Sequence, residues 1–195
     1  MSKGLIGVGV IAAIALVLVA TGVGSYNRLV ELDEGVVNAW SQVENVYQRR
    51  ADLIPNLVAT VKGAKDFEQE TLTQVVEARA KVGQVNLGSA PDAEQLAQFE
   101  AAQSQLSSAL SRLLVVVERY PELKATEAFR DLQAQIEGTE NRIAVERRRF
   151  NDATLAYNKT RRRFPTVLLA SMMGFDDKPY FESTSGADEP PKVEF

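Results

Sequence analysis

The sequence predicts an all-α protein in which an N-terminal transmembrane helix continues into an antiparallel bundle of about four long helices. A short apolar C-terminal segment and a disordered acidic tail are expected to follow. Two observations predict this fold. First, residues 4–24 carry no charge, and at about 1.5 Å of rise per residue they can cross the roughly 30 Å hydrocarbon core of a bilayer. Second, apolar residues beyond this run recur every three or four positions, the spacing of one helix face.

Residues 1–25 are predicted to be a membrane anchor. Ala20-Thr21-Gly22 resembles the cleavage site of a secretory signal, which is the alternative, but the run exceeds the usual apolar core of about 7 to 15 residues. A lipoprotein anchor is excluded because its acylation needs a cysteine, and the chain has none. Lys3 before the run and Arg28 after it nearly balance, and the free amine beside Lys3 favours a bundle that lies outside the cytoplasm. The anchor residues singled out are Leu5, Ile11, Ile14, Leu16 and Leu18.

The anchor is predicted to continue without a break into the first helix of the bundle. Pro55 interrupts this helix and removes one backbone hydrogen bond, but the apolar pattern resumes after it. We therefore expect a kink near residues 53–55 and not the end of the helix. The apolar stripe comprises Val36, Trp40, Val43, Tyr47, Ala51, Ile54, Val58 and Val61.

Three more helices are predicted from the same spacing and from the breaks between them. They cover about residues 64–85, residues 92–119 with Asp92 as the N-cap, and about residues 121–163. Amphipathic helices joined by short turns favour an antiparallel bundle over residues 26–182. Residues expected in the bundle core or at a subunit interface are Trp40, Val43, Tyr47, Ile54, Leu57, Ile143, Phe150 and Tyr157.

Five charged residues lie on or beside the predicted apolar stripes. They are Glu44, Arg50, Asp52, Glu146 and Arg147. One interpretation is that these side chains reach solvent from the edge of the core. The other is a partly buried network of ion pairs between the first and last long helices, which would fix their register.

Two arginine triplets, residues 147–149 and 161–163, are 14 positions apart on the last predicted long helix. This spacing is close to four helical turns, so both triplets lie on roughly the same face. They are expected either to pair with nearby acids or to form a surface for lipid headgroups or an acidic partner. The nearby acids are Glu140, Glu146 and Asp152.

Residues 164–175 form a short apolar segment after the predicted end of the bundle. The segment is too short to span a bilayer. It covers an open end of the core, lies in a membrane interface, or docks on a neighbouring subunit. The residues predicted to contact a partner or lipid are Arg161, Arg162, Arg163, Leu168, Leu169, Met172, Met173 and Phe175.

The net charge of −4 resides in residues 176–195, which hold six acidic residues against two lysines. The body before them is neutral, and no recognisable nucleic-acid-binding module is present, so no nucleic-acid partner is expected. Residues 183–195 combine low hydrophobicity with serine, glycine and proline, which predicts a disordered tail.

The residue types present argue against an enzyme. The chain contains no histidine and no cysteine, which removes Ser-His-Asp and Cys-His arrangements, the Glu-x-x-His motif of di-iron bundles and histidine-based zinc sites. No phosphate-binding glycine loop follows a strand. We therefore expect no catalytic residues, no metal and no cofactor. The well-filled apolar stripes also leave no room for a small-molecule substrate.

Several stretches resemble the LemA family of bacterial membrane proteins. The most specific are AWSQVENVYQRRADLIPNLVATVKG at residues 39–63, GTENRIAVERRRFNDA at residues 138–153 and GFDDKPYFE at residues 174–182. Shorter matches are Tyr26-Asn27, Arg119-Tyr120-Pro121 and Tyr157-Asn158. The resemblance implies a single-pass, N-terminally anchored helical bundle of the bacterial envelope, and it supplies no catalytic residues.

The resemblance also bears on function. Relatives in the family include a protein involved in magnetosome membrane formation, and the genes often neighbour those for envelope metallopeptidases and TPM-domain proteins. The expected function is therefore a homo-oligomeric membrane scaffold. The alternative is a monomeric adaptor for an envelope protease or another membrane protein.

Overall fold

The computed structural model describes residues 3–65, 67–85 and 90–182, with side chains from residue 7 onward. Every regular element in these ranges is a helix, which confirms the all-α prediction. The predicted tail, residues 183–195, lies outside the described residues, as does most of the predicted turn after residue 85. The helices are α1 (Lys3–Lys62), α2 (Gln69–Gln84), α3 (Ala93–Val117), α4 (Pro121–Lys124), α5 (Glu127–Arg161) and α6 (Thr166–Met173).

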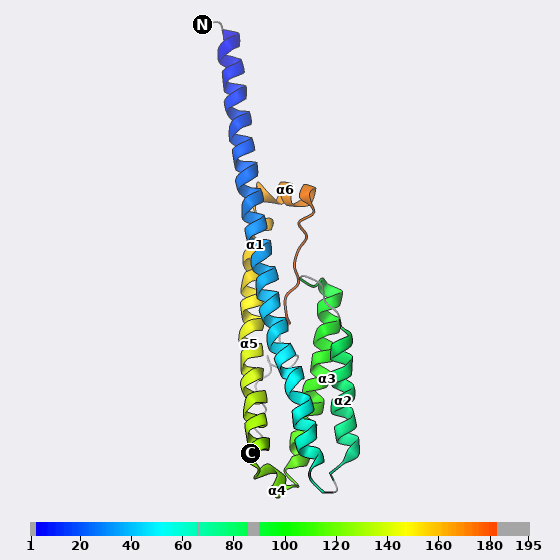
Figure 1. The fold of residues 1–195 in the computed structure, drawn as a ribbon. Coiled ribbons are helices and arrows are strands. Elements are labelled where there is room, and N and C mark those ends of the chain that lie inside the picture. The colour runs from blue at the N-terminus through cyan, green and yellow to red at the C-terminus, as the bar shows by residue number, and fades with distance from the viewer. Residues whose placement is uncertain (1–2, 66, 86–89, 183–195) are drawn as a thin grey trace, which may run out of the picture.

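Helix α1 joins the apolar N-terminal run to the bundle without a break. It is 60 residues long and continues through Pro55 to Lys62, as the resumption of the apolar pattern predicts. Its N-terminal part projects beyond all the other helices (Figure 1). The exposed apolar run and the bundle therefore share one helix.

The bundle consists of two helix pairs packed together. Helix α1 packs most extensively along α5, and α2 along α3. Helix α1 runs antiparallel to α5 and α2 runs antiparallel to α3, and α4 forms a short turn at the end farthest from the projecting run (Figure 1). Helix α6 lies across α1 at the opposite end and contacts both α1 and α5.

The buried residues follow an alternating three-and-four spacing, which is the seam of a coiled coil. In α1 the seam contains Val36, Trp40, Val43, Tyr47, Arg50, Ile54, Leu57 and Val61. In α3 it contains Leu96, Phe99, Gln103, Leu106, Leu110, Leu113 and Val117. In α5 Phe129, Ile136, Ile143, Phe150 and Tyr157 recur at every seventh position. This repeat keeps one face of each long helix against its neighbours.

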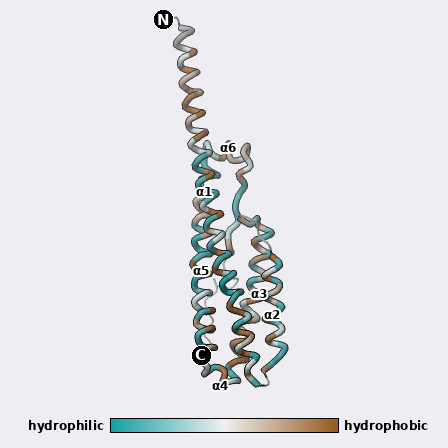
Figure 2. The backbone as a smooth tube through the Cα atoms, in the orientation of Figure 1, coloured by the Kyte–Doolittle hydropathy of each residue, from teal (hydrophilic) through white to brown (hydrophobic). Residues whose placement is uncertain are grey.

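The core consists of two apolar clusters along the bundle axis. One, which includes Ile54, Leu106 and Phe129, lies toward α4. The other, which includes Trp40 and Phe150, lies toward α6. The hydropathy of the tube in Figure 2 is highest along the projecting part of α1 and alternates along the bundle helices.

Two predicted helix boundaries were wrong. Helix α2 begins at Gln69 and not at residue 64, because Gly63 and Ala64 bond back to the last turn of α1 and Glu68 is extended. The predicted fourth helix is divided into α4 and α5 at Thr126. There the Thr126 side chain accepts a hydrogen bond from the Phe129 amide and caps a new helix start.

Candidate functional site

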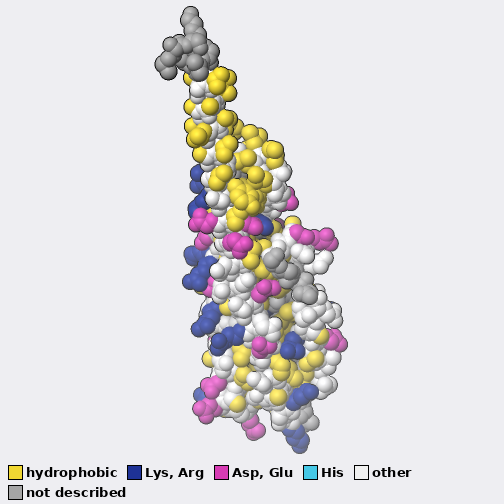
Figure 3. Space-filling model, turned by 45° about the horizontal axis from the view of Figure 1, so that its top comes forward, with side chains coloured by type: hydrophobic (Ala, Val, Ile, Leu, Met, Phe, Trp, Pro, Cys, Tyr) yellow, Lys and Arg dark blue, Asp and Glu magenta, His cyan; other side chains and the backbone are white. Residues whose placement is uncertain are grey.

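The projecting part of α1 exposes a continuous apolar surface. Its most hydrophobic 18-residue window has a mean hydropathy of 2.4 and no buried residue. Ile11, Ile14, Leu16 and Leu18 are all exposed, and hydrophobic side chains gather over this part of the molecule in Figure 3. The side chain of Leu5 lies outside the described ones. Within the described residues, this is the one helix that is long and apolar enough to cross a membrane.

Helix α6 packs on α1 where the apolar run ends. Thr166 and Ala170 are buried on its inner side, and Cδ1 of Leu169 lies 4.0 Å from the position that a Cβ atom would occupy at Gly22. Just beyond α6, the ring of Phe175 meets the ring of Tyr26 edge to face, with 5.8 Å between their centroids. The level of α6 along α1 is thus fixed by packing.

Residues 174–182 form an extended return segment along α5. Gly174 ends α6 with a φ of 75°, a left-handed conformation that favours glycine. The Asn158 side chain then donates to the Lys178 carbonyl oxygen at 2.8 Å and accepts from the Lys178 amide at 3.0 Å. Asn151 makes the same pair of bonds with Phe181, at 3.0 and 2.9 Å.

The spacing of these two asparagines matches the return segment. Asn151 and Asn158 are seven residues apart, which is about 10.5 Å along a helix. Lys178 and Phe181 are three residues apart, which is about 10 Å in an extended chain. Each asparagine amide offers one donor and one acceptor to a backbone amide and carbonyl. The two side chains therefore pair with the segment as a neighbouring strand would.

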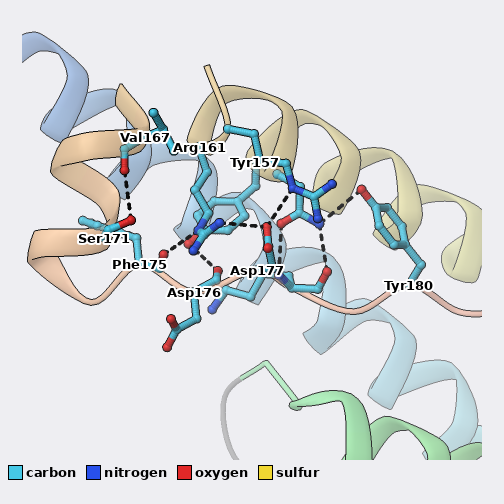
Figure 4. A network of polar contacts seen from close by, with 11 residues as sticks. Tyr157, Arg161, Val167, Ser171, Phe175, Asp176, Asp177 and Tyr180 are labelled. Carbon is cyan, nitrogen blue, oxygen red and sulfur yellow. Dashed lines mark hydrogen bonds and ion pairs between the residues drawn. The ribbon is translucent and has the colours of Figure 1, made fainter. Parts of the chain in front are cut away.

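Polar contacts close the junction between α6 and the return segment (Figure 4). Arg161 donates through Nε to the Phe175 carbonyl oxygen at 2.5 Å, and the Tyr157 hydroxyl donates to the Asp176 carbonyl oxygen at 2.9 Å. Asp177 pairs with Arg161 and Arg162, each at 3.1 Å. Burial raises the pKa of the Tyr157 hydroxyl to about 12, so it remains a donor at neutral pH.

A second ion pair attaches the return segment to α1. Nζ of Lys178 lies 2.8 Å from Oδ1 of Asp33. Since the Lys178 backbone is held by Asn158 of α5, this one residue connects α1 to α5. The junction therefore fixes α1, α5 and α6 against one another.

An aromatic cluster lies beneath the end of the return segment. Phe181 stacks on Trp40 with 6.1 Å between ring centroids and meets Phe150 edge to face at 5.4 Å. The Arg147 guanidinium lies 4.5 Å from the centre of the Phe181 ring. The same arginine pairs with Glu100 of α3 at 2.6 Å. Burial raises the pKa of the Glu100 carboxyl.

A polar layer separates the two apolar clusters of the core. Arg50 occupies a seam position of α1, and its side chain is 1% exposed. It donates to Gln103 and to Ser107 of α3, the latter at 2.9 Å, and pairs with Glu140 of α5. The Tyr47 ring lies 5.1 Å from the Arg50 guanidinium. Three helices are thus joined by one buried cation.

The described residues contain no group of three or more His, Cys, Asp or Glu side chains that could hold a metal ion. The LemA family model matches residues 39–195. The chain belongs to the LemA family. The matched residues span the bundle part of α1, the helices from α2 to α6 and the return segment.

Several named proteins are similar to this LemA-family chain. Magnetosome protein MamQ 2 of Paramagnetospirillum magneticum is 26% identical over 201 residues, which cover 93% of this chain and 74% of that protein. Magnetosome protein MamQ of Magnetospirillum gryphiswaldense is 25% identical over 183 residues, covering 85% and 67%. Protein LemA of Metamycoplasma hominis is 24% identical over 162 residues, covering 83% and 71%.

The sequence-predicted residues of this LemA-family protein fall into different environments. The eight residues expected in the core or at an interface are all buried. Of the five charged residues on the stripes, Arg50 and Arg147 pair between helices. Asp52 accepts a hydrogen bond from Gln48 and Glu146 pairs with Arg149, each within its own helix. Glu44 is half-buried, and burial raises the pKa of its carboxyl.

The residues of the arginine triplets and of the apolar segment also fall into different environments. Arg147 and Arg161 both reach the return segment, whereas Arg148 and Arg163 are exposed. Of the segment residues predicted to contact a partner or lipid, Leu169 and Phe175 are partly buried, and Leu168, Met172 and Met173 are exposed.

Sequence reasoning missed Gln103, Asn151 and Asn158. All three are polar residues at positions that face inward. The seven-residue spacing of the two asparagines on the core side of α5 was the available signal.

Proposed function

We propose that this LemA-family protein is a non-enzymatic scaffold of the bacterial inner membrane that self-associates through its helical bundle. One observation carries the proposal: the exposed apolar run and the bundle are parts of one uninterrupted helix. An apolar helix with no buried residue needs a lipid environment. The bundle attached to it would therefore hold its own surface at a fixed height above the bilayer.

The surface of the bundle supports self-association. Large apolar side chains are exposed on three of its helices: Val76 on α2, Val115 on α3, and Val145 and Leu155 on α5. No group among the described residues offers a metal site, which favours a protein that acts by contact. The similarity to magnetosome proteins is a further support for a role at a membrane.

The test is the mass of the full chain in lipid nanodiscs, measured by native mass spectrometry, together with co-purification of two differently tagged copies. We expect an oligomer that retains both tags. Val115→Glu or Leu155→Glu should lower its mass, because a charge on an exposed apolar position opposes burial between copies.

Gly9→Leu is the matched control in the anchor. A Cβ atom at Gly9 meets nothing within 4 Å in one chain, so this change should leave a bundle-mediated oligomer intact. If Gly9→Leu alone abolishes the oligomer, then the anchor and not the bundle mediates assembly. A monomer at every concentration would overturn the scaffold and favour the adaptor for an envelope metallopeptidase or another membrane protein.

The side of the membrane is part of the same proposal. With Lys3 inside, the bundle would lie outside the cytoplasm. A reporter enzyme that is active only outside the cytoplasm, fused after Phe195, should be active. Activity of a cytoplasm-specific reporter at the same position would reverse the orientation.

A further inference from the structure

Helix α6 exposes apolar side chains on the face opposite to its packed one. Its packed side, Thr166 and Ala170, is buried against the bundle. The outer side carries Leu168 and Met172, which are 59% and 83% exposed, and Phe164, two residues before the helix, is 82% exposed. A helix that is apolar on both sides needs a second apolar medium on its outer side.

The level of α6 along α1 identifies that medium. Leu169 approaches α1 at Gly22, and Phe175 meets Tyr26. The uncharged run before Gly22 is about 27 Å long as a helix, close to the roughly 30 Å of a hydrocarbon core. A bilayer that surrounds this run therefore ends at the height at which α6 lies across α1 (Figures 1 and 3).

The charges at this level suit a lipid headgroup region. Asp177 is paired with Arg161 and Arg162, Lys178 with Asp33, and Arg28 with Glu31. Within the described part of the chain, the side chains of Arg163 and Asp176 make no hydrogen bond or ion pair. Counted together, these groups leave one net positive charge. Arg163 directly precedes Phe164, so an exposed cation adjoins the apolar outer side.

We propose that α6 lies in the headgroup–acyl boundary of the same bilayer that α1 crosses. Phe164, Leu168 and Met172 enter the acyl-chain boundary, and Arg163 meets the lipid phosphates. The inference rests on the proposed function in one respect, that the apolar run of α1 is inserted in a membrane. It adds a second membrane contact, which fixes the depth and the rotation of the bundle.

The absence of cysteine from the sequence allows a direct measurement of depth. Single-cysteine variants Leu168→Cys and Met172→Cys are made in the full chain, labelled with a nitroxide and reconstituted in vesicles of phosphatidylcholine and phosphatidylglycerol. Electron paramagnetic resonance then gives the ratio of collisions with oxygen to collisions with a water-soluble nickel chelate. Leu16→Cys in the apolar run and Glu122→Cys on α4, at the end of the bundle farthest from that run, are the controls, because both side chains are exposed in the chain itself and neither is on the proposed self-association surface.

We expect ratios at positions 168 and 172 that are several-fold above that of the position 122 control and below that of position 16. Ratios equal to the position 122 control would place α6 in water and overturn the inference, while a high ratio at position 16 would leave the anchor intact. Protection from both reagents, with spin–spin broadening between copies, would show that a second copy covers α6 and would also overturn it. A water-like ratio at position 16 would instead refute the proposed anchor.

Discussion

The amide of Asn158 holds the backbone of Lys178 through two hydrogen bonds, one donated at 2.8 Å and one accepted at 3.0 Å. The Lys178 side chain then pairs with Asp33 of α1. The Asn158 side chain thus makes the backbone hydrogen bonds that an adjacent strand would make in a sheet. The return segment needs this arrangement because an extended chain cannot satisfy its own backbone groups.

Asn158→Ala should release the return segment. The substitution removes two hydrogen bonds and leaves partly buried backbone groups unpaired, at a cost of about 1–3 kcal/mol in the free energy of unfolding. Urea titration of the full chain in detergent measures the cost, and hydrogen exchange at residues 175–182 reports the release. Asn141→Ala, at an exposed position of the same helix, is the control. Equal hydrogen exchange at residues 175–182 in the two variants would contradict this role of Asn158.

Glu140→Ala should destabilise the bundle by leaving Arg50 buried without its carboxylate. Removing one partner of a buried ion pair costs about 3–5 kcal/mol. We expect about 2–3 kcal/mol here, because Glu140 is 42% exposed and Arg50 keeps Gln103 and Ser107. The double variant Arg50→Met with Glu140→Gln should lose less than Glu140→Ala alone, since no buried charge remains. Arg142→Met, an exposed arginine of α5, is the control; a double variant less stable than Glu140→Ala would argue against this account.

The stability of the bundle should fall as the pH rises from about 10 to about 12. Burial raises the pKa of Tyr157 from its usual value of 10.0 to about 12, so the folded state holds this proton more tightly than the unfolded state. The resulting stabilisation is fully present below pH 10 and is lost as the pH rises through 12. Tyr157→Phe should flatten this fall in urea titrations at several alkaline pH values. If Tyr157→Phe leaves the slope of stability against pH unchanged, then Tyr157 does not contribute to this fall.

Asp92→Ala should shift the start of α3. Asp92 accepts a hydrogen bond from the Gln95 amide at 2.8 Å, and the Gln95 side chain accepts one from the Asp92 amide at 3.0 Å. Loss of such a cap costs about 0.5–2 kcal/mol. Asp92→Asn removes the charge but retains the capping oxygen, so its stability should lie near that of the unchanged chain. If both variants lose the same free energy, then charge and not capping is responsible.

Local sequence patterns predicted most of the helices of this protein but not the contacts between them. The uncharged run and the apolar spacing predicted that α1 passes through Pro55, and Asp92 marked the start of α3. The division at Thr126 was missed because apolar residues keep their helical spacing on both sides of it. The apolar spacing is the same whether a threonine caps a helix or lies inside one, so the spacing does not reveal the helix start.

The polar contacts depended on residues far apart in the chain. The sequence left two environments open for Arg50, a solvent-exposed edge of the core or a partly buried ion pair between the first and last long helices. Its partner Glu140 is 90 residues away, so no local pattern decides between the two environments or identifies the partner. The position of the return segment could not be predicted either. Asn151 and Asn158 bond to its backbone groups, and such bonds do not depend on which residue types the segment contains.

Because α1 is uninterrupted, the bundle tilts together with the apolar run in the bilayer. The part of α1 beyond Gly24 is about 57 Å long at about 1.5 Å per residue. A change of about 10° in the tilt of the apolar run, which a small change in bilayer thickness can produce, would swing the far end of the bundle by about 10 Å. Membrane thickness would thereby be converted into lateral displacement of the turn between α1 and α2.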